Sequence, residues 1–143
     1  MLAYLLVSIL VGLGVFEVLI MSRTLQLPTA QMLIYSGRPD PQWNMPVDHW
    51  NQLNELVDAL PGRVEHQGTF DEPSLLGYRG FQSEWNDHKI FYVAQTKQAV
   101  HVQVGSYTVH EDSSNSIEQW FVKNAKEDGD LDLEIPTIQF HSH

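Results

Sequence analysis

The first 21 residues form an almost unbroken apolar run, MLAYLLVSILVGLGVFEVLIM, interrupted only by Ser8 and Glu17. As a helix with a rise of about 1.5 Å per residue, this run is about 30 Å long, which matches the hydrocarbon core of a bilayer. Backbone amides have no water partner in lipid, so a spanning segment satisfies them as a helix. The rest of the chain has no second run of this kind. We therefore expect one transmembrane anchor, residues 1–22, that carries one water-soluble domain.

A cleaved signal peptide is the main alternative to an anchor. Such a peptide has a basic start and a small-x-small cleavage site. No basic residue precedes the run, and Glu17–Thr24 has no Ala-x-Ala pattern, which favours an uncleaved anchor. A buried core helix is a further alternative. Lys and Arg near the ends orient an anchor, and Arg23 is balanced by the N-terminal amino group, so the side of the membrane stays open.

Four residues of the run could pack the anchor against another membrane helix. Ser8 and Gly12 form a small-x-x-x-small pair that allows close approach, and Gly14 adds a second narrow position. Glu17 can snorkel to the interface or bond to a neighbouring membrane helix. Both features are compatible with packing inside a larger membrane assembly.

The remaining sequence, about 120 residues, has the usual length of one domain. The chain has 8 Lys+Arg against 18 Asp+Glu, a net charge of −10. An acidic domain is repelled by phosphate backbones and by anionic lipid headgroups, so we expect no nucleic-acid partner and attachment to the bilayer only through the anchor. The absence of Cys excludes disulfides, thiol catalysis and Cys-ligated metal.

The pattern after the anchor predicts an α+β domain. We expect a connector at 23–30, the domain at 31–128 and an acidic tail at 129–143 that could add an edge strand, dock onto a partner or stay loose. Short strands joined by tight turns predict a small, mostly antiparallel sheet with two helices on one face. The expected strands are 31–35, 75–81, 89–95 and 98–104, with a possible extension at 107–109, and 63–74 is expected to be a loop.

The two expected helices have recognisable starts and ends. The first has Asn44 as its cap and stops at Pro61-Gly62, and its apolar positions recur at helical spacing. The second follows Asn115, which with Glu118 resembles a capping box, and it ends near Gly129.

Three motifs, SGRPDPQW at 36–43, LGYRGF at 76–81 and IEQWF at 117–121, occur in this order. The chain resembles a set of small bacterial proteins of uncharacterised function that share SGRPNPxW, LGYRGF and LExWLL-like motifs. The resemblance covers about residues 33–125, departs at Asp40, where Asn is commoner, and does not include the anchor. It implies a shared domain and no chemistry. We expect the bilayer to be a bacterial inner membrane.

The Ser36–Trp43 loop and Arg79 are the candidate binding residues. Arg38 could present its guanidinium to a carboxylate or phosphate, or it could pair with Asp40 or a loop carbonyl and fix the turn. Trp43 is expected to hold the loop against the core. Arg79 could contribute to the same site or bond a neighbouring acid.

No metal site or cofactor is predicted. The seven His residues lack the His-x-x-x-His spacing of a helical zinc site and are interpreted as scattered surface residues. Asp128, Asp130 and Asp132 imitate the start of a calcium loop, but Leu133 and Gln139 stand where Gly and Glu are needed.

Three functions fit this sequence. The first is a non-catalytic accessory subunit whose anchor docks on other membrane subunits, with respiratory and photosynthetic complexes as hosts by analogy. The second is a tethered module that binds a small ligand or basic partner through the Ser36–Trp43 loop. The third is an enzyme that uses Arg38, Asp40, Arg79 and nearby His, and it requires these groups to converge. The first is the expected function.

Overall fold

The computed structural model describes residues 26–73 and 77–136. The predicted anchor, with Ser8, Gly12, Gly14 and Glu17, lies outside these residues. Within the described ranges, neither helix is long and apolar enough to cross a bilayer.

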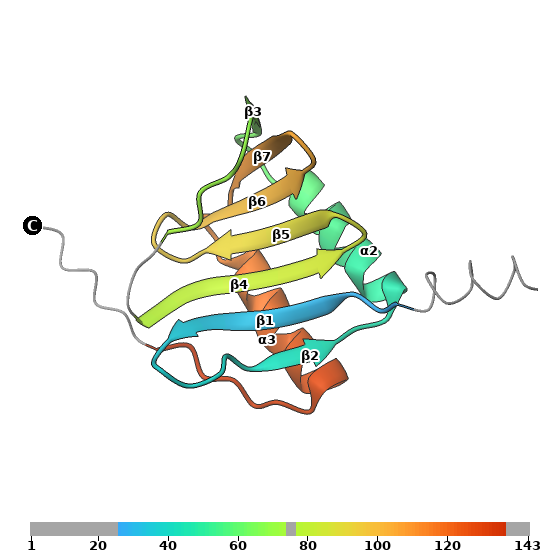
Figure 1. Cartoon of the computed structure of the whole chain (residues 1–143), viewed down its shortest axis with the longest axis vertical. Coiled ribbons are helices and arrows are strands. Elements are labelled where there is room, and N and C mark those ends of the chain that lie inside the picture. Colours follow the sequence, from blue (N-terminus) through green and yellow to red (C-terminus); the bar gives the residue numbers. More distant parts are fainter. Residues whose placement is uncertain (1–25, 74–76, 137–143) are drawn as a thin grey trace, which may run out of the picture.

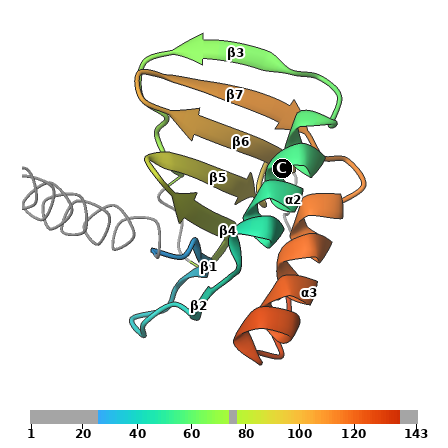
Figure 2. The ribbon, with the colours of Figure 1, turned by 90° about the vertical axis from the view of Figure 1, so that its right-hand side faces the viewer.

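The domain is α+β, as predicted. Its seven strands form one sheet in the order β2-β1-β4-β5-β6-β7-β3, and every neighbouring pair is antiparallel. Both helices cover the same face of this sheet (Figures 1 and 2). In chain order the elements are β1 (Thr29–Tyr35), β2 (Gln42–Asn44), α2 (Val47–Asp58), β3 (Val64–Gln67), β4 (Gly77–Trp85), β5 (His88–Val93), β6 (Gln98–Gln103), β7 (Ser106–Glu111) and α3 (Ser116–Gly129).

The strand register defines two opposite ends of the sheet. Thr29 of β1 pairs with Glu84 of β4, and Tyr35 pairs with Gly77. We call the first the entry end, because the described chain begins there, and it includes the β4–β5 turn. We call the second the loop end, which carries the β1–β2 loop at 36–41 (Figure 1). At about 3.3 Å per strand residue, six residues separate the two ends by about 20 Å.

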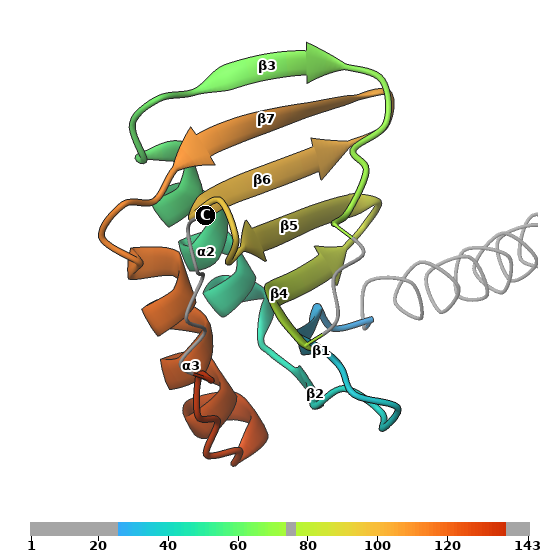
Figure 3. The ribbon, with the colours of Figure 1, turned by 90° about the vertical axis from the view of Figure 1, so that its left-hand side faces the viewer.

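The main core lies between the sheet and the two helices. Phe81 of β4 stacks on Phe121 of α3 with ring centroids 5.0 Å apart, and both side chains are fully buried. A smaller apolar cluster lies on the other face of the sheet, formed by Leu33, Phe91, Val93 and Val100. Figure 3 shows the segment that leaves the end of β3. Phe70 of this segment packs against the second cluster, and its ring centroid lies 5.2 Å from that of Phe91.

A bulge in β4 requires glycine at position 80. The β1–β4 register shifts between Leu33 and Ile34, and Gly80 has φ +127°. A Cβ atom there would lie 1.8 Å from the carbonyl oxygen of Tyr92. Only glycine combines this backbone conformation with so close an approach of β5.

The predicted cap of the first helix is wrong. Asn44 belongs to β2 and pairs with Thr29. The helix starts at Val47 after Pro46, which is extended and provides no side-chain cap. Strand pairing with β1 therefore outweighs the local capping preference of Asn44. Leu56, one of the apolar residues that recur at helical spacing in this helix, is 41% exposed.

The predicted capping box of the second helix is also wrong. Asn115 is in the left-handed region (φ 58°) and makes no side-chain cap hydrogen bond. Asp112 replaces it: its Oδ1 accepts the Ser116 N–H and its Oδ2 the Ile117 N–H, each at 3.0 Å. Glu118 instead accepts a hydrogen bond from the Tyr78 hydroxyl at 2.8 Å. The turn at 112–115 brings Asp112 back over the helix start, which local spacing does not reveal.

The sequence analysis did not predict two short strands, β2 and β3. The segment 63–74, expected to be a loop, contains β3, which pairs with β7 at the sheet edge and is exposed along its length. The second is β2, at the other edge. Strands of three or four residues are too short to show a hydrophobic periodicity in the sequence, and their pairing depends on the neighbouring strand. In the tail, residues 130–136 form no strand, and Leu131, Leu133 and Ile135 pack against the main core.

Candidate functional site

The Ser36–Trp43 loop is held by Asp40. Its Oδ1 accepts the Ile34 N–H at 2.9 Å and its Oδ2 accepts the Gln31 amide at 3.3 Å. Arg38 is exposed and makes no side-chain hydrogen bond or ion pair within the described residues. Asp40 therefore fixes the loop to β1 through one backbone and one side-chain hydrogen bond, and Arg38 is exposed within the loop.

Trp43 and Arg79 have structural partners. Trp43 is 6% exposed, and its indole N–H donates to Asn124 Oδ1 at 2.7 Å. The Arg79 guanidinium forms an ion pair with Glu72 at 3.3 Å, which holds the segment before β4 against the sheet. In the described part of the chain, Arg38, Asp40 and Trp43 make no hydrogen bond or ion pair with one another. The loop contributes one exposed guanidinium and no gathered set of reactive groups.

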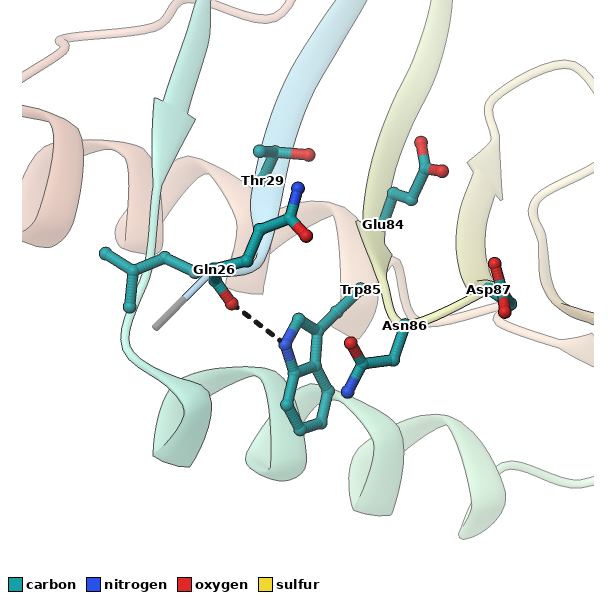
Figure 4. Close-up of a pocket in the computed structure, with 7 residues that line it drawn as sticks. Gln26, Thr29, Glu84, Trp85, Asn86 and Asp87 are labelled. Atoms are coloured by element: carbon teal, nitrogen blue, oxygen red, sulfur yellow. Dashed lines mark hydrogen bonds between the residues drawn. The ribbon is translucent and has the colours of Figure 1, made fainter. Parts of the chain in front are cut away.

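A cavity of about 440 Å³ lies at the entry end, and Figure 4 shows its lining. We call it the entry cavity. The indole N–H of Trp85 donates to the carbonyl oxygen of Gln26 at 3.2 Å. Asn86 and Asp87 have positive φ angles of 48° and 64° and form the tight turn that a two-residue hairpin needs. The lining residues are Gln26, Leu27, Thr29, Glu84, Trp85, Asn86 and Asp87.

The entry cavity favours a cation. Glu84 and Asp87 are exposed and line it, and none of the described residues that line it is basic. Lys89 lies opposite Glu84 in the β4–β5 register, yet no ion pair joins them. The ring of Trp85 adds an aromatic face that can take a guanidinium or ammonium group. No pattern in the sequence indicates this cavity, because its residues come from the start of β1 and from a distant hairpin.

Three His residues lie on the helix-covered face of the sheet, and the interpretation of the histidines as surface residues is wrong for two of them. His101 is 6% exposed and His110 is fully buried. His88 Nδ1 lies 3.0 Å from His101 Nε2, so one ring donates to the other. Burial, and then the neighbouring His88, lower the pKa of His101. Strand alternation places these rings on the helix-covered face of β5, β6 and β7.

His49 is the only histidine in the described residues that groups with two carboxylates. Its Nδ1 lies 2.6 Å from Asp128 Oδ2 and its Nε2 lies 3.9 Å from Glu127 Oε1. The hydrogen bond to Asp128 is the main cause that raises the pKa of His49. His49 lies in the first turn of α2 and its partners in the last turn of α3, 78 and 79 positions away in sequence. Helix packing alone brings these side chains together.

Comparison of the chain with protein-family models, curated proteins and solved structures gives no match.

Proposed function

We propose that this protein is a membrane-anchored, non-catalytic accessory subunit that docks on a larger membrane complex. The supporting observation is the position of the entry cavity. The apolar run ends at Met21, and Gln26, five positions later, is part of the cavity lining. An anchored domain would therefore hold the cavity close to the bilayer, where neighbouring subunits stand. Respiratory and photosynthetic complexes remain the hosts by analogy.

The chemistry of the entry cavity suits a basic side chain of a partner subunit. Lys and Arg are enriched in the short cytoplasmic loops that flank membrane helices. Such a side chain would meet Glu84, Asp87 and the ring of Trp85 in one place. A bilayer-proximal Trp also suits the interfacial region, where amphipathic rings are favoured.

Fractionation of native membranes tests the anchor and the complex together. The full-length chain should stay in the pellet after an alkaline carbonate wash and should migrate at high mass after mild detergent extraction. Release into the supernatant would contradict the anchor, and migration as a free monomer would contradict the complex.

Site-specific photo-crosslinking tests the docking surface. A photoreactive residue in place of Asn86, in the entry cavity, should crosslink to a host subunit. The same residue in place of Thr96, an exposed position in the β5–β6 turn at the loop end, is the matched control. Crosslinks from Thr96 and none from Asn86 would place the partner at the wrong end for this proposal.

The exposed Arg38 supports a second candidate, a tethered module that binds a small ligand through the Ser36–Trp43 loop. Its guanidinium would take an anionic ligand or a carboxylate, at the end of the sheet about 20 Å from the entry cavity. Substitution of Arg38 with Ala should then abolish ligand binding and leave the melting temperature nearly unchanged. Trp43 is buried and cannot contact the ligand without unfolding the loop.

A further inference from the structure

The strongest unassigned cluster is the group of His49, Glu127 and Asp128, between the first turn of α2 and the last turn of α3. One ligand atom from each residue lies within 4.8 Å of the others. The Nδ1 atom of His49 is held by Asp128 at 2.6 Å, so Nε2 is the ring nitrogen left for another partner. This nitrogen lies 3.9 Å from Glu127 Oε1.

Hydrogen bonds among Trp43, Asn124 and Asp128 hold the Asp128 carboxylate in place beside His49. Asn124 is 4% exposed and donates to Asp128 Oδ2 at 2.6 Å, and it accepts the indole N–H of Trp43. Asp128 therefore accepts two hydrogen bonds at one oxygen and can hold the imidazole in one orientation. A histidine whose Nδ1–H donates to a carboxylate while Nε2 faces outward has the arrangement typical of a metal-ligating histidine.

The surroundings also suit a cation. His49 and Glu127 line a surface cavity of about 480 Å³ together with the carboxylates of Asp48 and Glu55. Among the described residues that line it, Lys123 is the one Lys or Arg. In a tetrahedral zinc site with bonds of about 2.0–2.1 Å, two ligand atoms are about 3.3 Å apart. Glu127, whose side chain is 56% exposed, can close the 3.9 Å separation by rotating its side chain.

We infer that His49 Nε2 and Glu127 bind a divalent transition ion such as Zn²⁺, with Asp128 as the positioning residue and water in the remaining positions. The combination of imidazole nitrogen and carboxylate oxygen favours zinc-like ions over Mg²⁺ or Ca²⁺, which prefer all-oxygen sites. The ion would join α2 to α3 and so stabilise the helical layer. This inference does not depend on the proposed membrane function.

Titration of the full-length chain with ZnCl₂ by calorimetry, paired with thermal unfolding, tests the site. All variants carry His141→Ala and His143→Ala, since these two histidines could bind zinc themselves. We expect zinc to bind and to raise the unfolding temperature. His49→Ala and Glu127→Gln should each weaken zinc binding by about tenfold or more, and Asp128→Asn should do so through ring orientation.

His66→Ala is the matched control, because His66 is an exposed histidine of β3 that stacks on Tyr107 away from the helices. It should leave zinc affinity unchanged. Glu127 is exposed, so its variant reports binding without loss of the fold, and the unfolding temperature without zinc verifies this for each variant. Absence of zinc binding, or equal affinity in the parent and in His49→Ala and Glu127→Gln, would overturn the inference.

Discussion

At the scale of single residues, Asp112 stabilises the start of α3 although it lies in the turn before that helix. It is fully buried, and its two oxygens accept the first two backbone N–H groups of α3. Asp112→Ala would leave these donors unsatisfied, and we expect a loss of about 2 kcal/mol in unfolding free energy. Urea unfolding followed by tryptophan fluorescence measures the loss. Ser114→Ala, an exposed change in the same turn, should stay within about 0.5 kcal/mol, and equal losses for the two variants would refute the capping role.

The buried His101, whose ring bonds to the half-buried His88, predicts sensitivity of the fold to acid. The pKa of His101 in the folded protein lies below its ordinary value of 6.5, so the unfolded chain binds protons more readily. Its contribution to stability is therefore constant above pH 6.5 and is lost as the pH falls from 6.5 toward the folded pKa. The groups that act on it are His88, Asp58, His110 and Arg63.

Histidine resonances in a pH titration by NMR test this prediction. The resonance that disappears in His101→Asn should have its midpoint below pH 6.5. The same variant should lose less stability than the parent protein between pH 7 and pH 5. A midpoint at or above 6.5 would contradict the prediction, because a solvated ring titrates near 6.5 and a ring paired with a carboxylate titrates higher.

At the scale of single elements, the bulge in β4 sets the alignment of three strands. Gly80→Ala would place a Cβ atom 1.8 Å from the Tyr92 carbonyl oxygen, so β4 and β5 would have to separate. We expect a loss of at least about 3 kcal/mol, from the clash and the positive φ together. The measurement is the denaturation midpoint of the full-length chain.

Gly105→Ala separates these two effects. Gly105 also has a positive φ, of +80°, but nothing lies within 4 Å of its added Cβ. This variant should lose only about 1 kcal/mol, the conformational part. Similar losses of unfolding free energy in Gly80→Ala and Gly105→Ala would mean that the clash with β5 adds nothing to the cost of the positive φ.

The elements that the sequence predicted are those with a strong local pattern. Alternating apolar residues revealed β5 and β6, and helical spacing revealed α2 and α3. The caps and edges were predicted poorly for one reason. Asn44 is favoured at helix caps, but it pairs with Thr29 of β1 and so belongs to β2. Asp112 caps α3 although it lies four residues before Ser116. The first outcome depends on a strand partner 15 positions away, and the second depends on the backbone conformation of the 112–115 turn. The capping preference of a single residue predicts neither.

At the scale of the whole molecule, the sheet separates two possible binding surfaces. Glu84 and Asp87 lie in the entry cavity, and Arg38 lies at the loop end. If the accessory-subunit proposal holds, Glu84→Gln together with Asp87→Asn should lower the yield of co-purified host subunits several-fold and leave the melting temperature nearly unchanged. Asn tolerates the left-handed conformation of position 87, so the turn should persist.

A control with the same charge change distinguishes the entry cavity from net charge. Glu65→Gln with Asp71→Asn removes two exposed acidic charges that do not line the cavity. Quantitative mass spectrometry of the purified complexes compares the two double variants. Equal losses in both would attribute the effect to overall charge and would remove the entry cavity from the proposal.

The sequence by itself determined the α+β class, the two helices and the central strands, because apolar periodicity is a local property of the chain. It also supplied the apolar run on which the predicted anchor depends. Only the tertiary structure decided which side chains meet. His49 reaches Asp128, and Gln26 reaches Trp85, across 79 and 59 positions. Contacts over such separations arise from packing and strand register, which no local pattern of residues records.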